Sequence, residues 1–106
     1  MAGKSFPELI AEEKPLIMPG VFDGLSARLA EQAGFTSLFI GGFPVVGARY
    51  GVPDIGLRAL GDIAAATADI SQVTNLPLFV DIDDGYGDVK NAVNTVHVYE
   101  KMGVSA

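Results

Sequence analysis

The residues best placed to do chemistry lie in the stretch Val80-Asp81-Ile82-Asp83-Asp84-Gly85-Tyr86-Gly87. This stretch continues an apolar run that begins at Pro77 and has the pattern of a buried strand. Alternate residues of a strand point to the same face, so Asp81 and Asp83 would place two carboxylates close together. Two such charges need a counter-charge, and no lysine or arginine is near them in the sequence. A divalent cation bound through oxygen meets that need, and Mg²⁺ requires only one or two carboxylates.

The same acidic stretch has a second interpretation, as a solvated turn whose aspartates begin the next helix. Asp84 and Asp88 are both placed to cap that helix, and for Asp88 this interpretation is the better one. Asp81 directly follows apolar residues, so we expect metal binding there rather than a surface role. Gly85 and Gly87 would let a ligand approach the backbone.

Two further clusters carry candidate binding groups. The backbone amides of Gly41, Gly42 and Phe43 could hold a carboxylate or phosphate oxygen, although a glycine pair more often reflects tight packing. The carboxylate of Asp54 either reaches a metal-bound water or begins the turn into the next helix, and its spacing does not decide between these roles. Arg49 could pair with a substrate carboxylate but is better explained as a solvated loop residue.

These clusters stand at the ends of three strand-helix units in series. Apolar runs typical of strands cover residues 16–22, 37–42 and 77–83, and helical periodicity follows each of them, over residues 25–34, 60–73 and 88–103. A long loop rich in glycine and proline links the second run to its helix, and residues 6–13 form a lead helix. Runs that are apolar on both faces and joined by helices predict an α/β fold with parallel strands and outer helices. The carboxyl ends of such strands form ligand sites.

Individual residues set the expected ends and faces of the helices. Asp23 is placed to cap the first helix after a strand, and Gly34 can take the left-handed conformation that ends it. In the last helix, Val89, Val93 and Val96 recur at helical spacing and are expected to face inward.

Composition and charge restrict the partners of the chain. It has 106 residues, no cysteine and a formal net charge of -6 at pH 7. The lack of cysteine excludes disulfides, a thiolate zinc site and a cysteine nucleophile within these residues. The negative charge disfavours nucleic acid and anionic membranes. No apolar run is long enough to cross a bilayer and the start of the chain is acidic, so we expect a cytoplasmic protein without a membrane partner.

The last residues, Val104-Ser105-Ala106, begin where a fourth strand is due. A parallel sheet that stops after three units exposes a strand edge and one side of its core. We therefore expect residues 1–106 to be a single domain that is the N-terminal portion of a longer fold, or a chain that needs a partner. Within it, residues 1–15 would be a lead helix and linker, and residues 16–106 the strand-helix units.

Four motifs together resemble one known family. In order and spacing, the chain resembles the isocitrate lyase/phosphoenolpyruvate mutase superfamily. It looks closest to short members such as 2-methylisocitrate lyase, oxaloacetate decarboxylase and carboxyvinyl-carboxyphosphonate phosphorylmutase type proteins. The resemblance implies a partial (β/α)8 TIM barrel, made of its first three strand-helix units and the start of a fourth strand. The motifs that carry it are Pro19-Gly20-Val21-Phe22-Asp23-Gly24-Leu25-Ser26-Ala27-Arg28, Glu31-Gln32-Ala33-Gly34-Phe35, Gly51-Val52-Pro53-Asp54-Ile55-Gly56 and Asp81-Ile82-Asp83-Asp84-Gly85-Tyr86-Gly87.

The resemblance also implies roles for individual residues. Asp81 matches the direct ligand of Mg²⁺, for which Mn²⁺ is an alternative, Asp83 a ligand through water, and Asp54 a member of the metal-water network. The amides of Gly41, Gly42 and Phe43 match those that bind the substrate carboxylate. Three positions depart from the family pattern: serine is usual at Gly41, an aromatic hydroxyl or indole is common at the substrate-binding position Phe39, and threonine is frequent at Asp84. The general acid and the cysteine loop of the family lie beyond Ala106, so no catalytic residue is assigned.

The function implied for the intact protein is that of a magnesium-dependent carbon-carbon lyase, acting through an enolate on small 2-oxo or 2-hydroxy di- or tricarboxylates. One alternative within the fold is phosphonopyruvate or phosphoenolpyruvate mutase or hydrolase chemistry. Another is a non-catalytic truncated fragment. The intact family members imply a homo-oligomer, either a dimer or a tetramer.

Overall fold

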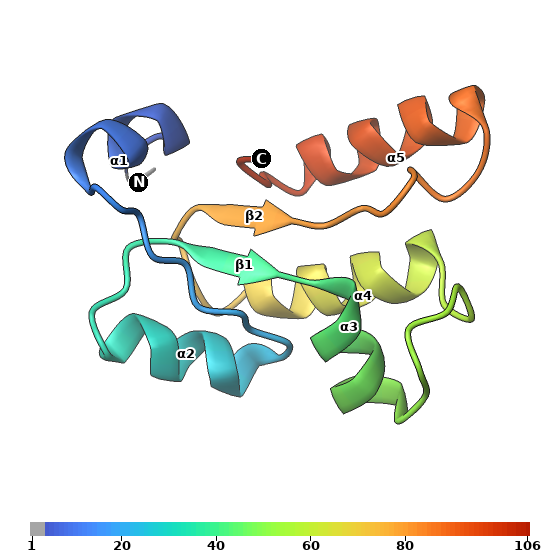
Figure 1. Ribbon diagram of the computed structural model, residues 1–106, viewed down its shortest axis with the longest axis horizontal. Coiled ribbons are helices and arrows are strands. Elements are labelled where there is room, and N and C mark those ends of the chain that lie inside the picture. The colour runs from blue at the N-terminus through green and yellow to red at the C-terminus, as the bar shows by residue number, and fades with distance from the viewer. Residues whose placement is uncertain (1–3) are drawn as a thin grey trace.

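The computed structural model describes residues 4–106, so the first three residues of the expected lead segment lie outside the described residues. Helices and two short strands alternate along the chain (Figure 1). Within the described residues, no helix is both long and apolar enough to span a membrane. The elements, in chain order, are α1 (Phe6–Glu12), α2 (Gly24–Gln32), β1 (Leu38–Ile40), α3 (Gly42–Val45), the π-helix η1 (Val46–Tyr50), α4 (Leu60–Ser71), β2 (Leu78–Val80) and α5 (Val89–Lys101).

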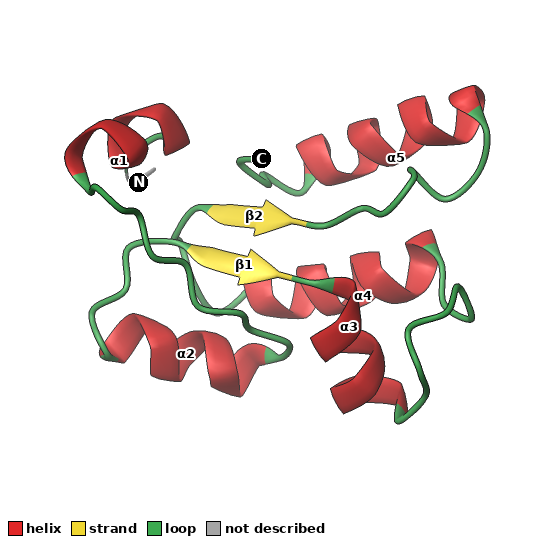
Figure 2. Ribbon diagram, in the orientation of Figure 1, coloured by secondary structure: helices red, strands yellow, loops and turns green. Residues whose placement is uncertain are grey.

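The strands β1 and β2 are parallel, as expected, and pair in register with Leu38 opposite Leu78 (Figure 2). One backbone segment lies along each outer side of this pair. At the β1 side, Val21 donates to the carbonyl of Phe39 and Phe39 donates to that of Pro19. At the β2 side, Ser105 and Ala106 donate to the carbonyl of Leu78, and Val80 donates to that of Ala106. Four chain segments therefore run side by side, two of them as strands.

The strand expected over residues 16–22 is wrong, because this segment forms only an isolated bridge between Gly20 and Phe39. Proline lacks the N–H that a strand ladder needs, and Pro19 stands in the middle of this segment, with Pro15 just before it. The apolar pattern correctly placed this segment beside the second apolar run, but it did not predict how few of its residues pair with β1. The other two runs do form strands, shorter than their apolar patterns.

The two faces of the sheet are covered differently. Leu38, Ile40, Leu78 and Val80 are buried under the helices α2, α4 and α5, in one continuous core. Phe39 and Phe79 alternate with these residues and therefore point to the opposite face, where their ring centroids are 5.7 Å apart. Further core residues from the helices are Ala27, Ile63, Ala66, Ile70 and Tyr99.

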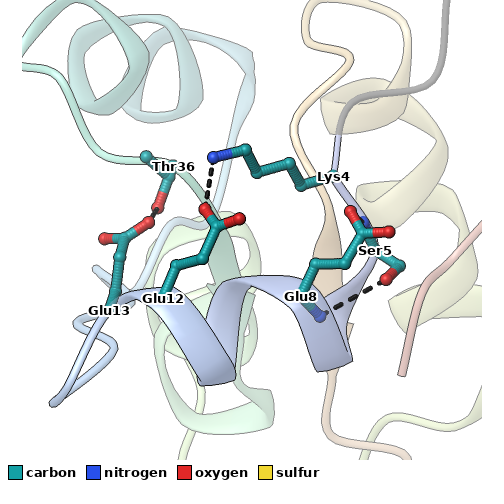
Figure 3. Close-up of polar contacts among 6 residues, drawn as sticks. All are labelled: Lys4, Ser5, Glu8, Glu12, Glu13 and Thr36. Atoms are coloured by element: carbon teal, nitrogen blue, oxygen red, sulfur yellow. Dashed lines mark hydrogen bonds and ion pairs between the residues drawn. The ribbon is translucent and has the colours of Figure 1, made fainter.

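Helix α1 lies near the amino ends of the strands (Figure 1) and contacts the face that carries Phe79. Its Phe6 ring is 5.7 Å from that of Phe79. The helix begins with a capping box between Ser5 and Glu8, and a salt bridge joins Lys4 to Glu12 (Figure 3). Close to its end, Glu13 accepts a hydrogen bond of 2.6 Å from the Thr36 hydroxyl. These contacts attach the expected lead helix to the sheet.

The caps expected for α2 and α5 are confirmed. Asp23 accepts from the amide of Ser26 at 2.7 Å, and Gly34 follows the helix with φ +99°. Asp88 accepts from the amides of Lys90 and Asn91, so it caps α5 as its better interpretation predicted. Each cap satisfies amides that have no partner within the helix.

The inward face expected for α5 is wrong. Val89, Val93 and Val96 are exposed, whereas Thr95 and Tyr99 are buried. Both sets have helical spacing, so the pattern alone did not distinguish them. The choice follows from the preceding turn, whose Gly85 carbonyl accepts from the Thr95 hydroxyl at 2.7 Å. This hydrogen bond turns the Thr95 side of the helix inward.

Part of the loop expected after β1 is helical, because α3 and η1 together cover Gly42–Val45 and Val46–Tyr50. Pro44 is tolerated there because the first turn of a helix needs no N–H donor from it. The helical segment ends at Gly51, which has φ +66°. Figure 1 shows α3 at the carboxyl end of β1.

Candidate metal and carboxylate site

The acidic segment follows β2, but not as a continuation of the strand. The strand ends at Val80, and Asp83 has φ +50°, in the left-handed region. The amide of Asp83 donates to Oδ1 of Asp81 at 2.8 Å, which forms a tight turn. The expectation of strand alternation at Asp81 and Asp83 is therefore wrong, because a turn rather than the strand pleat sets their relative positions.

The structure brings Asp54 to the same place from a separate loop. A methyl group added at Gly42 would lie 3.4 Å from Oδ2 of Asp54 and 3.8 Å from Oδ1 of Asp83. Gly42 is buried at the start of α3. The carboxylates that follow β1 and β2 thus converge beside a glycine whose lack of a side chain leaves room for them.

The electrostatics of this cluster favour a cation. The pKa of the Asp83 carboxyl is raised, first by partial burial and then by repulsion from Asp81, Asp54 and Asp84. Oxygen donors of this kind suit Mg²⁺ or Mn²⁺, and one or two of them are sufficient for Mg²⁺. In the part of the chain that the structure describes, no group of three or more potential ligands is arranged to hold a metal ion. The donor set therefore fits such an ion in its chemistry, without forming a closed cage.

The segment Gly41-Gly42-Phe43 occupies the end of β1 and the first turn of α3. The first amides of a helix have no intrahelical acceptor, so this backbone offers donors to an anion. Gly41 also has a packing role, because a methyl group there would lie 2.9 Å from Cε1 of Phe39. The Phe43 side chain is 74% exposed. Of the two interpretations of the glycine pair, tight packing applies at Gly41.

The glycines of the acidic segment pack against α5. A methyl group at Gly85 would lie 2.6 Å from Cβ of Ala92, and one at Gly87 would lie 2.5 Å from Asn91. Their φ angles, +87° and +151°, are also ones that other residues rarely adopt. These two positions therefore require glycine for packing against the helix, and Gly87 also lines a cavity beside Asp83 and Asp84.

Two tyrosines near the carboxylates were not singled out from the sequence. Burial raises the pKa of Tyr86 well above its usual range, with additional effects from Tyr99, Asp83 and Asp81. Burial also raises the pKa of Tyr99 to about 12. Both hydroxyl oxygens are buried without a hydrogen bond to any described residue. The motif position of Tyr86 was visible in the sequence, but nothing in the pattern of α5 distinguished Tyr99.

Arg49 lies at the surface, as expected from its interpretation as a solvated residue rather than a substrate ligand. It is exposed on η1 and its Nη1 lies 3.4 Å from Oδ2 of Asp69. Its positive charge is thus paired with a surface helix residue.

The fold and the convergent carboxylates define a parallel α/β protein whose candidate site follows the strand ends. The family model of phosphoenolpyruvate phosphomutase matches residues 6–106, and the chain belongs to this family. The resemblance to the isocitrate lyase/phosphoenolpyruvate mutase superfamily is thereby confirmed.

Named relatives support this assignment. The chain is 40% identical over 105 residues to 2-methylisocitrate lyase of Shewanella oneidensis, covering 99% of this chain and 36% of that protein. Oxaloacetate acetylhydrolase has a similar structure, with a TM-score of 0.81 and 37% identity over 85% of this chain and 32% of that one. Phosphonopyruvate hydrolase in complex with oxalate and Mg²⁺ gives a TM-score of 0.76 and 33% identity, covering 82% of this chain and 30% of that one. The chain spans about a third of the length of these relatives.

Proposed function

We propose that the intact protein is a magnesium-dependent carbon-carbon lyase acting on small 2-oxo or 2-hydroxy di- or tricarboxylates. The observation that carries the proposal is the convergence of the Asp54 and Asp83 carboxylates beside Gly42, where the backbone also offers amides. A cation site and an anion site would then adjoin each other, as a chelated carboxylate requires. The reaction class, cleavage of a carbon-carbon bond, is proposed from the names of the similar lyase and acetylhydrolase.

Each group of the chain has a distinct part in the proposed chemistry. Asp81 and Asp83 would hold Mg²⁺, or Mn²⁺ in its place, and Asp54 would accept hydrogen bonds from its waters. The cation supplies the positive charge that stabilises an enolate when a carbon-carbon bond breaks. The amides of Gly42 and Phe43 would orient the substrate carboxylate, with Gly41 and the Phe39 ring shaping the adjoining wall. The general acid would come from outside these residues.

The architecture of the intact protein belongs to the same proposal. The four parallel segments at Gly20, β1, β2 and Ser105 are the arrangement expected of the first part of a (β/α)8 barrel. In this proposal residues 1–106 form its N-terminal portion, and the intact protein is a cytoplasmic dimer or tetramer.

A metal titration of the chain tests the site without relying on turnover. We expect Mg²⁺ to raise the melting temperature of the wild-type chain in a saturable manner, because a ligand that binds only the folded state stabilises it. Asp81→Asn and Asp83→Asn should reduce this rise strongly. Asp69→Asn, which removes one negative charge from the outer surface of α4, is the matched control and should retain it. Equal Mg²⁺ responses in all four proteins would contradict the proposal.

Phosphonate chemistry is the second candidate, since phosphonopyruvate hydrolase is among the similar structures and the family model bears the name of a phosphomutase. Product assays on the intact protein distinguish the two candidates. Pyruvate release from methylisocitrate or oxaloacetate would support a lyase, and phosphate release from phosphonopyruvate would support the alternative.

A non-catalytic role for the chain by itself is the third candidate, because the chain spans about a third of the length of its relatives. Its discriminating observation is a comparison of the 106-residue chain with the intact protein. Magnesium-dependent turnover by the chain alone would contradict this candidate.

A further inference from the structure

A cavity adjoins the carboxylate cluster, and Gly42 is not among the residues that line it. It has a volume of about 430 Å³ and lies between the loop before α4 and the turn after β2. Asp83 and Asp84 line it from the turn, with Tyr86, and Arg58 lines it from the loop. Among the described residues that line this cavity, Arg58 is the one with a positive charge.

The guanidinium group of Arg58 is held in place, but one of its N–H donors has no partner among the described residues. Its Cζ lies 4.0 Å from the centre of the Tyr50 ring, within the range of a cation–π contact. Its ion pair is with Asp62, at a distance of 3.9 Å, rather than with an aspartate of the cavity. Its Nε–H is buried and makes no hydrogen bond to any described residue. A buried donor without an acceptor is costly, so this arrangement indicates an acceptor supplied by a ligand.

We propose that Arg58 binds a second carboxylate of the ligand, beyond the carboxylate held near Gly42. A guanidinium group presents paired N–H donors that match the two oxygens of a carboxylate. Asp83 lies near Gly42 and also lines this cavity, so the two proposed anion positions adjoin the same aspartate. The site would therefore select dicarboxylates over monocarboxylates. The identification of this ligand as a substrate rests on the proposed function.

Two inert acids of equal chain length test the proposal directly. Succinate has two carboxylates and butyrate has one, and neither can react, so calorimetric titration measures binding alone. We expect the wild-type chain to bind succinate more tightly than butyrate, at constant ionic strength and with Mg²⁺ present. In wild type, the Arg58 Nε–H resonance should shift as succinate saturates, which a purely structural arginine would not show.

Three variants distinguish the charge of the Arg58 side chain, the shape of its guanidinium group and the general effect of losing an arginine. Arg58→Gln should weaken succinate binding by about tenfold or more, because a charged hydrogen bond to a carboxylate is lost, while leaving butyrate binding unchanged. Arg58→Lys should retain part of the affinity. Arg49→Gln is the matched control, since Arg49 also lies near the Tyr50 ring, at 5.6 Å, but does not line the cavity. It should bind succinate like wild type.

The possible outcomes distinguish this inference from the proposed function. Unchanged succinate affinity in a folded Arg58→Gln chain, a stationary Nε–H resonance or no saturable succinate binding to wild type would each overturn the role of Arg58. If the chain binds Mg²⁺ but Arg58 is without effect, only this inference fails. If Arg58-dependent succinate binding occurs without any Mg²⁺ response, the anion site is supported and the proposed metal-dependent function fails.

Discussion

At the scale of single residues, Gly41 and Phe39 depend on each other. The position of the Phe39 ring leaves no space for a side chain at residue 41, since a methyl group there would lie 2.9 Å from Cε1 and 3.2 Å from Cδ of Pro44. Gly41→Ser should therefore destabilise the chain by about 1–3 kcal/mol, the usual cost of overpacking. The free energy of unfolding from denaturant titration measures this effect.

Two further variants isolate the clash as the cause. Phe39→Leu frees the space beside residue 41, so the double variant Gly41→Ser with Phe39→Leu should be more stable than the sum of the single changes predicts. Gly47→Ser is the control, because no heavy atom lies within 4 Å of a methyl group at that position. Strict additivity would show that the glycine is required for another reason. A serine at Gly41, usual in the family by resemblance, thus calls for another arrangement of residue 39.

Gly85 is under two constraints, a positive φ and a lack of space for a side chain, and comparison with Gly103 distinguishes their effects. It has φ +87° and no room for a side chain against Ala92, whereas Gly103 has nearly the same φ, +85°, and open space around it. Gly85→Ala should cost more stability than Gly103→Ala, by about 1–3 kcal/mol, because only the first adds a steric clash to the backbone strain. Denaturant titrations of both variants provide the comparison. Equal losses would show that backbone conformation alone accounts for Gly85.

At the scale of elements, features set by residues close together in the sequence were predicted correctly. The packing of one element against another was not. The caps at Asp23 and Asp88 act over three residues, so they could be identified from spacing alone. The orientation of α5 depends on the contact of Thr95 with the Gly85 carbonyl, which joins separate elements. In the site, the sequence indicated that Asp81 and Asp83 lie close together, but it could not predict the turn that positions Asp83 or the unsatisfied donor on Arg58.

The orientation of α5 gives a prediction for the whole helix. Val93 is exposed and Thr95 is buried, although the sequence pattern favoured the valine as the core residue. Val93→Ala should change the free energy of unfolding by less than about 0.5 kcal/mol. Thr95→Ala should cost about 1–3 kcal/mol, because it removes a buried hydrogen bond and leaves the Gly85 carbonyl without this donor. A larger loss for Val93→Ala than for Thr95→Ala would mean that the valine face of α5 is covered.

At the scale of the whole molecule, structural support and candidate chemistry lie at opposite ends of the sheet. Helix α1 packs near the amino ends of the strands, and the carboxylates gather after their carboxyl ends (Figure 1). This separation is the general arrangement of parallel α/β folds, in which loops after the strands can vary without disturbing the core. Tyr99 is the exception, because it belongs to the core and its pKa also responds to Asp83.

This connection between core and site predicts how stability depends on alkaline pH. The pKa of Tyr99 is raised by burial from 10.0 to about 12, so between these values the unfolded chain releases the proton that the folded chain retains. Ionisation then favours unfolding, and the contribution of Tyr99 to stability should fall by up to about 1.4 kcal/mol for each pH unit in this interval. Below pH 10 it should have no slope, since both states keep the proton.

Unfolding free energies of wild type and Tyr99→Phe, measured from pH 8 to 12, test this slope, because the variant lacks the hydroxyl that ionises. The phenylalanine variant should gain on wild type as the pH rises above 10, because it has no proton to release on unfolding. Parallel pH profiles of the two proteins would show that the Tyr99 hydroxyl is accessible to water in the folded chain.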